Sequence, residues 1–180
     1  MSSLYVGNHA LQLSEELEEV FEEASAAREG GDRLPVLVLD YVAAQRPNLD
    51  KFFSNEIRDG RQRRRNAHGV IIDFAGSKLV ANFGTLASSN FTASIGRIKT
   101  RLWDLKVDRD SEPSVPATRD HEMIVQHPPM NDPQLTEKQV GRLKEALQAL
   151  EEQADQEEIR LRPLNTVEQI GEHILLREAA

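Results

Sequence analysis

The sequence predicts an α+β fold with a mixed sheet of about five strands and four to five packed helices. Short apolar runs of strand length alternate along the 180-residue chain with longer segments of helical periodicity. Hydrophobic residues make up 39% of the chain and charged residues 29%, which is typical of a globular protein and not of a disordered one. The length suits one folding unit, so we expect residues 1–180 to form a single α+β domain.

The first third of the chain is expected to hold a helix, a strand and a further helical segment. The stretch SEELEEVFEEASAAREGG (14–31) places apolar residues at helical spacing between a serine and two glycines. LPVLVLD (34–40) is an unbroken apolar run, and its length favours a buried strand. A helical segment is expected across NLDKFFSNEIRDG (48–60).

The middle of the chain predicts a β-hairpin and then an amphipathic helix. HGVIIDFAGSKLVANFG indicates two strands, 68–74 and 78–83, joined by a turn that contains Gly76. Five apolar residues then recur every three or four positions and predict a helix over 89–106. These residues are Phe91, Ile95, Ile98, Leu102 and Leu105. Residues 107–120 contain prolines, serines and alternating charges, so we expect a long loop or internal hinge there.

The last third predicts the order strand, helix, strand, helix. EMIVQ (122–126) has the character of a strand, and IRLRPL (159–164) alternates as a strand should. The spacing Thr-x-x-Gln at 136–139 and again at 166–169 is that of a capping box at a helix start. A helix between two strands predicts a crossover onto one sheet.

Several classes of protein are disfavoured by composition and motifs. The chain has no cysteine, which excludes a disulfide framework, a thiolate nucleophile and a cysteine-ligated zinc site. It shows no signal-peptide pattern and no apolar run near the ~20 residues that span a membrane. These features favour a cytoplasmic protein with no membrane partner. Phosphate-binding, dinucleotide-binding and hydrolase motifs are missing too, so no cofactor is predicted.

The charge is distributed unevenly. The formal net charge is −8, but residues 51–106 carry eleven basic and four acidic side chains, a net of +7. The rest of the chain carries 11 basic and 26 acidic side chains, a net of −15. A basic centre between acidic flanks indicates a polyanionic partner or complementary assembly, although acidic helices often serve only as solvated faces.

The densest positive charge is RQRRR (61–65), which leads directly into the apolar run of the hairpin. Guanidinium groups are permanently charged planar forks that match phosphate oxygens, and several together gain by releasing counterions from a nucleic acid. Two alternatives remain open: pairing with the acidic helices of the same molecule, or contact with an acidic protein partner. As loop residues, Arg63, Arg64 and Arg65 are expected to be replaceable by alanine without loss of folding.

A second basic element lies on the predicted helix 89–106. At 100° per residue, Arg97 and Arg101 follow one margin of its apolar stripe, and Lys99 and Lys106 follow the other. Trp103 falls beside the two lysines, where it can stack on a base or anchor an interface. The alternative is that it packs against a neighbouring element, with the lysine stems covering its edges.

A metal-dependent nuclease is the leading alternative from another class. Glu56, Asp73 and Asp104 could hold Mg²⁺, with Lys106 supporting the developing charge. However, Asp104 and Lys106 fall at the end of a helix, whereas the expected acidic-x-Lys pair lies on a strand next to the first acidic one. No catalytic residue is therefore assigned.

The segment HEMIVQH (121–127) superficially resembles a metal-binding motif. On a strand, His121 and His127 point to the same side but lie ~20 Å apart, which is too far for one ion. The sequence therefore predicts no metal-ligating residue.

These observations favour a non-catalytic binding module that contacts nucleic acid or an acidic protein surface through its basic central region (51–106), as a subunit of a larger assembly. A purely structural adaptor is a third possibility. The candidate nucleic-acid-binding residues are Arg61, Arg63, Arg64, Arg65, Arg97, Lys99, Arg101, Trp103 and Lys106.

Overall fold

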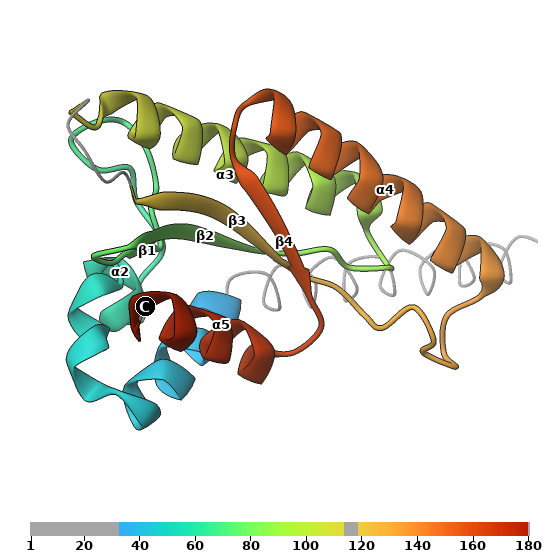
Figure 1. Cartoon of the computed structure of the whole chain (residues 1–180). Coiled ribbons are helices and arrows are strands. Elements are labelled where there is room, and N and C mark those ends of the chain that lie inside the picture. The colour runs from blue at the N-terminus through green and yellow to red at the C-terminus, as the bar shows by residue number, and fades with distance from the viewer. Residues whose placement is uncertain (1–32, 114–118, 180) are drawn as a thin grey trace, which may run out of the picture.

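A computed structural model describes residues 33–113 and 119–179 (Figure 1). The helix predicted at 14–31 lies outside the described residues. The helices are a first helix over 33–45, the 3₁₀ helix η1 Pro47–Phe52, α2 Asn55–Arg58, α3 Phe91–Ser111, α4 Glu137–Gln156 and α5 Val167–Ala179. The strands are β1 Phe74–Ala75, β2 Leu79–Thr85, β3 Asp120–Gln126 and β4 Arg160–Leu164. Among the described residues, no helix has the length and apolar character needed to cross a membrane.

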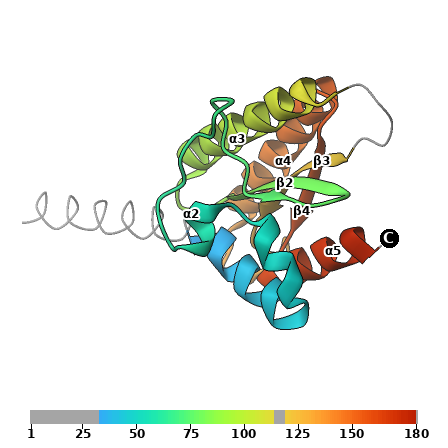
Figure 2. The same cartoon turned by 90° about the vertical axis from the view of Figure 1, so that its left-hand side faces the viewer.

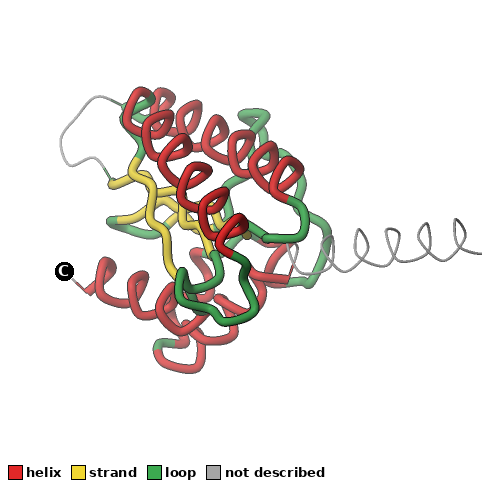
Figure 3. Tube along the Cα trace, turned by 90° about the vertical axis from the view of Figure 1, so that its right-hand side faces the viewer, coloured by secondary structure: helices red, strands yellow, loops and turns green. Residues whose placement is uncertain are grey.

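The strands form one mixed sheet in the order β1-β2-β3-β4. β1 runs antiparallel to β2, while β2, β3 and β4 are parallel to one another. Parallel neighbours need a crossover, and α3 and α4 supply the two crossovers. Figure 3 shows these two long helices together on the same side of the sheet. The predicted strand–helix–strand unit in the last third of the chain is confirmed.

Helices cover both faces of the sheet. α3 and α4 lie on one face, and the helix 33–45, η1, α2 and α5 lie on the other (Figure 2). Because successive side chains on a strand point to opposite faces, Met123 and Val125 pack under α3 and α4, whereas Ile124 faces α5. The two hydrophobic clusters are therefore separated by the sheet itself.

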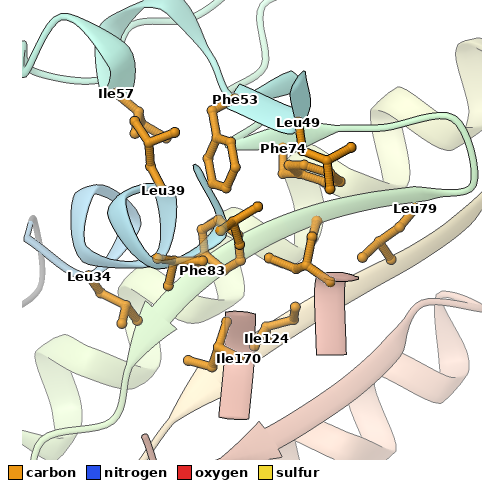
Figure 4. Close-up of a cluster of buried hydrophobic side chains, with 14 residues drawn as sticks. Leu34, Leu39, Leu49, Phe53, Ile57, Phe74, Leu79, Phe83, Ile124 and Ile170 are labelled. Atoms are coloured by element: carbon orange, nitrogen blue, oxygen red, sulfur yellow. The ribbon is translucent and has the colours of Figure 1, made fainter. Parts of the chain in front are cut away.

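The cluster on the α5 side contains three buried aromatic side chains among aliphatic ones. Phe53, Phe74 and Phe83 are almost fully buried there, together with Ile124 and Ile170 (Figure 4). The rings of Phe53 and Phe74 meet edge to face with centroids 5.0 Å apart, which is a favoured aromatic geometry. This packing ties η1 and β1 to the central strand β2.

The strand predicted at 34–40 is wrong, because these residues belong to the helix 33–45. Leu34, Val38 and Val42 are buried at a spacing of four, while Leu37 is 43% exposed, so burial follows the helical period. Packing on the sheet here overrides the strand preference of the valines. The described sheet consequently has four strands instead of about five, and the described residues hold six helices.

The first arm of the predicted hairpin is much shorter than expected. Only Phe74 and Ala75 pair with β2, and the chain before them is held by side-chain hydrogen bonds. Asn82 Oδ1 accepts from the backbone N–H of Asp73 at 2.8 Å, and Asn82 Nδ2 donates to the carbonyl of Ile71 at 2.8 Å. One buried asparagine thus replaces the backbone pairing that a longer strand would have made.

Helix ends follow the predicted signals except at the end of α3. The Thr-x-x-Gln capping boxes at 136–139 and 166–169 are both formed, which confirms them. Asn90 caps α3, but this helix continues to Ser111, five residues further than predicted. The predicted loop 107–120 is shortened accordingly, and its residues 114–118 lie outside the described chain.

Candidate nucleic-acid interface

Two buried carboxylates organise the arginines of the basic region. Asp73 is 0% exposed and Asp104 is 1% exposed. Arg63 Nη1 lies 3.1 and 2.8 Å from the two carboxylate oxygens of Asp73. Arg65 Nη1 is 3.0 Å from Asp104 Oδ1, and Arg101 Nη1 is 3.3 Å from Asp104 Oδ2. The carboxylate of Asp104 therefore joins Arg101 on its own helix to Arg65, which lies 39 positions before Asp104 in the chain.

Asp73 also belongs to the backbone framework of β2. Its Oδ2 accepts the backbone N–H of Phe83 at 2.9 Å. Its own N–H donates to Asn82, whose side-chain amide also donates to the carbonyl of Arg101 at 3.1 Å. The loop carrying Arg63, the end of β2 and the middle of α3 are thus linked by one buried polar network, which fixes the guanidinium groups relative to one another.

A cleft of about 410 Å³ lies beside this network. It is formed where β2 ends and along the first half of α3, and three of its lining residues are the arginines Arg63, Arg97 and Arg101. Among the described residues that line it, none is acidic. The carboxyl end of a parallel strand beside a helix is a common ligand position in α/β sheets. The remaining lining residues are Phe83, Gly84, Thr85, Ala93, Gly96, Ile98 and Thr100.

The guanidinium groups that line the cleft lie close enough to repel one another. Burial, and next the repulsion from Arg63, lower the pKa of Arg101, while the carboxylates of Asp73 and Asp104 partly offset this by raising it. Two buried carboxylates are therefore shared among three arginines, Arg63, Arg65 and Arg101. Arg97 adds a further positive charge to the lining of the cleft. An anion placed in the cleft would relieve that repulsion.

The other predicted arginines lie on the exposed surface. Arg61 is 65% exposed and pairs with Asp59. Arg64 and Arg97 are exposed, and neither forms a hydrogen bond or ion pair with a residue of the described chain. Arg97 lines the cleft and Arg64 lies in the loop between Arg63 and Arg65, so both guanidinium groups are available to a partner.

The second margin of α3 points elsewhere. Lys106 Nζ lies 2.6 Å from Glu157 Oε2 at the end of α4 and 4.9 Å from the ring centroid of Trp103. Trp103 is 55% exposed, so it lies on the surface and not in the core. Lys99 is exposed as well. Of the nine predicted residues, Arg63, Arg97 and Arg101 therefore line the cleft. The loop of Arg63 also carries Arg61, Arg64 and Arg65, and the opposite margin of α3 carries Lys99, Trp103 and Lys106.

We expected that the arginines of the RQRRR segment could be replaced without affecting folding. The contacts of Arg63 and Arg65 instead predict a loss of stability when these two are replaced. Arg63 is only 13% exposed in its side chain, and both Arg63 and Arg65 are partners of buried carboxylates. The alternative of pairing within the molecule holds for these two arginines, and within the described residues their partners include the buried carboxylates of Asp73 and Asp104.

The four residues suggested for a nuclease do not form one site. Asp73 and Asp104 are each held by arginines, Lys106 pairs with Glu157 at the end of α4, and Glu56 is half-buried on α2. Among the described residues, the only three potential ligand atoms that converge come from a different group, on α3 and β3.

Sequence reasoning selected the arginines but missed what holds them. Asp73 and Asn82 both interrupt apolar runs, VIIDF and LVANF, and a polar residue in a buried run needs a partner. That signal could have indicated a buried polar network at the end of β2.

Comparisons with protein-family models, curated proteins and solved structures found no match to this chain. Function is therefore inferred from the site itself.

Proposed function

We propose that this chain is a non-catalytic binding module that holds backbone phosphates of a nucleic acid in the arginine-lined cleft. The observation that carries the proposal is the cleft of about 410 Å³, whose described lining residues include Arg63, Arg97 and Arg101 and no acidic residue. Guanidinium groups donate well-directed hydrogen bonds to phosphate oxygens, and contacts of this kind supply most sequence-independent affinity.

The buried carboxylates favour binding by fixing the arginines in advance. Immobilising a long side chain on binding costs about 0.5–1.5 kcal/mol, and the contacts of Arg63 to Asp73 and of Arg101 to Asp104 have already met much of that cost on folding. Arg97 lines the cleft and has no hydrogen-bond or ion-pair partner among the described residues. The cleft therefore combines two positioned cations with one adaptable cation.

A ligand with several phosphates fits better than a single small anion. Positive charge continues beyond the cleft at the exposed Arg61 and Arg64 of the loop and at Lys99 on α3. A chain of phosphates can reach more than one of these groups, and each additional contact releases further counterions. Trp103 and Lys106 extend the same helix and could contact a longer ligand on its second margin.

We also propose a cellular compartment and an assembly for the module. We place it in the cytoplasm as an accessory subunit of a larger assembly, because the chain lacks cysteine and carries strongly acidic flanks around the basic region. The acidic flanks disfavour non-specific adhesion to polyanions, so contact with nucleic acid is confined to the central surface.

The proposal is tested by measuring the affinity of the full chain for labelled single-stranded RNA, single-stranded DNA and duplex DNA by fluorescence anisotropy. Measurements at three salt concentrations between roughly 50 and 200 mM should give a log–log slope of about −2 to −3, since three arginines line the cleft. Binding should persist in EDTA, and the oligonucleotides should stay intact in added Mg²⁺, whereas cleavage in Mg²⁺ would favour the nuclease alternative. Absence of binding, or binding that is independent of salt, would leave an acidic protein surface or a purely structural role as the better explanation.

A further inference from the structure

A second cluster of polar side chains lies at the opposite end of α3 from the cleft. Asp108 and Glu112 stand one turn apart where α3 ends, and His121 is the second residue of β3. Asp108 is eleven residues from Arg97, which corresponds to about 16 Å along the helix axis. We propose that Asp108, Glu112 and His121 bind a divalent transition-metal ion, independently of the arginine cleft.

The separations of the three ligand atoms suit one ion. His121 Nε2 lies 3.1 Å from Asp108 Oδ2 and 3.9 Å from Glu112 Oε1. The three ligand atoms all fall within 4.8 Å of one another. Metal–ligand bonds of about 2.1 Å in tetrahedral geometry place neighbouring ligand atoms about 3.4 Å apart. The observed separations lie on both sides of this value, so an ion can enter with small side-chain adjustments.

The orientation of the His121 ring points to a metal more directly. Its Nδ1 lies 3.1 Å from the backbone carbonyl oxygen of Arg119, which can only accept a hydrogen bond. Its Nε2 lies equally close, at 3.1 Å, to Asp108 Oδ2, which also only accepts. A neutral ring with its proton on Nδ1 therefore turns its Nε2 lone pair toward carboxylate oxygens, and this arrangement is favourable when a cation lies between them. Metal-bound histidines characteristically donate their other ring N–H in this way, and the bond fixes both the tautomer and the ring plane.

Burial strengthens this argument. The His121 side chain is 1% exposed, so water cannot satisfy its Nε2 lone pair from bulk solvent. A neutral imidazole that keeps its proton on Nδ1 for the Arg119 carbonyl has none on Nε2 to donate to Asp108 Oδ2. A bound cation would accept all three lone pairs at once, and this distinguishes the cluster from an exposed group of acidic residues. The competing arrangement is a doubly protonated imidazolium paired with the carboxylates.

The neighbouring charges define the strength and openness of the site. Arg119 Nε donates to Glu112 Oε1 at 2.8 Å, which orients that carboxylate but also competes with a cation for it. Glu112 and His121 line a cavity of about 630 Å³ whose other lining residues include Asp155 and Glu158. The three protein ligands therefore leave coordination positions open toward a cavity, where water or an exogenous ligand can complete the shell.

The donor set determines the class of metal. One imidazole nitrogen with two carboxylates suits Zn²⁺, Mn²⁺ or Co²⁺, whereas Mg²⁺ and Ca²⁺ prefer oxygen ligands only. An ion bound to these three residues would join the end of α3 to the start of β3. Sequence reasoning missed the site because it ended the helix at residue 106 and placed the i, i+4 pair of Asp108 and Glu112 in a loop.

The test is isothermal titration of the EDTA-treated, dialysed full chain with ZnCl₂, MnCl₂ and MgCl₂, together with the visible absorption of Co²⁺ added to the same sample. One equivalent of Zn²⁺ should bind, Mg²⁺ should bind far more weakly, and Co²⁺ should show the intense visible bands of a four- or five-coordinate site. Asp108→Asn and His121→Ala should each weaken Zn²⁺ binding by at least about tenfold.

Two controls keep this test decisive. Asp110→Asn removes a carboxylate from the same helix end, and His68→Ala removes an exposed histidine, and both should leave Zn²⁺ affinity unchanged. Asp108→Asn is nearly isosteric, so its circular dichroism should match the wild type even if His121→Ala folds poorly. Absence of Zn²⁺ binding by the wild type, or equal affinity in Asp108→Asn, would overturn the proposal in favour of an imidazolium ion pair. Neither result depends on the nucleic-acid measurements.

Discussion

One guanidinium nitrogen of Arg63 lies within hydrogen-bonding distance of both carboxylate oxygens of Asp73, at 3.1 and 2.8 Å, and Asp73 is fully buried. The same carboxylate accepts the backbone N–H of Phe83 on the central strand. An arginine that lines the candidate binding cleft is therefore also a component of the folded core. Binding and stability are coupled at this residue, so variants here need a measurement of each.

Removing Arg63 should destabilise the protein strongly. Arg63→Ala leaves the buried carboxylate of Asp73 without its charged partner, which typically costs about 3–5 kcal/mol in the free energy of unfolding. Arg64→Ala, which changes the neighbouring exposed arginine, should alter it by no more than about 0.5 kcal/mol. Urea unfolding of the two variants measures the difference. Equal stabilities would show that the Arg63–Asp73 pair is not formed in solution.

A methyl group at Gly84 should disturb the packing of α3 on the end of β2. A Cβ there would lie 2.9 Å from both Ile98 Cγ1 and Met123 Cε, which is closer than carbon atoms pack. Gly84→Ala should therefore lower the free energy of unfolding by about 1–3 kcal/mol.

Gly96 provides the matched control, because a Cβ at Gly96 meets nothing within 4 Å. It lies inside α3, where alanine favours the helix over glycine by about 0.5–1 kcal/mol, so Gly96→Ala should stabilise the protein. Thermal unfolding of both variants checks the opposite signs. A destabilised Gly96→Ala together with an unaffected Gly84→Ala would contradict the placement of α3.

Glu178 should make stability depend on pH in the acid range. Its carboxylate accepts hydrogen bonds from the Ser77 hydroxyl at 2.7 Å and from the N–H groups of Ser77, Lys78 and Leu79 at 3.0 Å each. Burial alone raises the pKa of Glu178, but these hydrogen bonds outweigh it and leave the pKa below its ordinary value of 4.5. The contribution to stability is therefore present above that ordinary pKa and is lost as the pH falls through the lower, folded-state pKa.

Glu178→Gln measures this contribution. The variant should be less stable than the wild type at pH 7, by up to about 1 kcal/mol given the partial exposure of the carboxylate, and the difference should shrink below the ordinary pKa. Glu151→Gln, an exposed position on α4, should show neither effect. A stability difference that stays constant from pH 7 down to the acid transition would refute the role of the Glu178 carboxylate.

Local sequence signals predicted helix starts better than helix extent or burial. Capping boxes at 136–139 and 166–169 depend on neighbouring residues only, and both were predicted correctly. The apolar run 34–40 fits either a strand or a helix, and the choice depends on packing against the sheet, which no local window contains. The extension of α3 to Ser111 was missed because its last turn is polar.

Sequence analysis predicted the cationic residues of the candidate site but not the buried carboxylates that hold them. The arginine cluster is visible in the composition of residues 61–65, but its partner Asp104 lies 39 residues from Arg65 and belongs to another element. Long-range pairs of this kind follow from the fold and not from spacing. The same is true of His121, whose neighbours Asp108 and Glu112 meet it only because β3 pairs in parallel beside β2.

The most direct test of the proposed function is the salt dependence of oligonucleotide binding by Arg97→Glu. Arg97 lines the cleft without a partner in the described chain, and glutamate is a good helix former, so folding should be unaffected. Arg46→Glu makes the same charge change at an exposed position after the helix 33–45, on the other side of the sheet. Arg97→Glu should weaken binding by at least about tenfold at low salt and flatten the log–log slope by about one unit or more, while Arg46→Glu retains most of the wild-type affinity. If both variants lose affinity equally, or neither does, the arginine-lined cleft is not where this protein meets a nucleic acid.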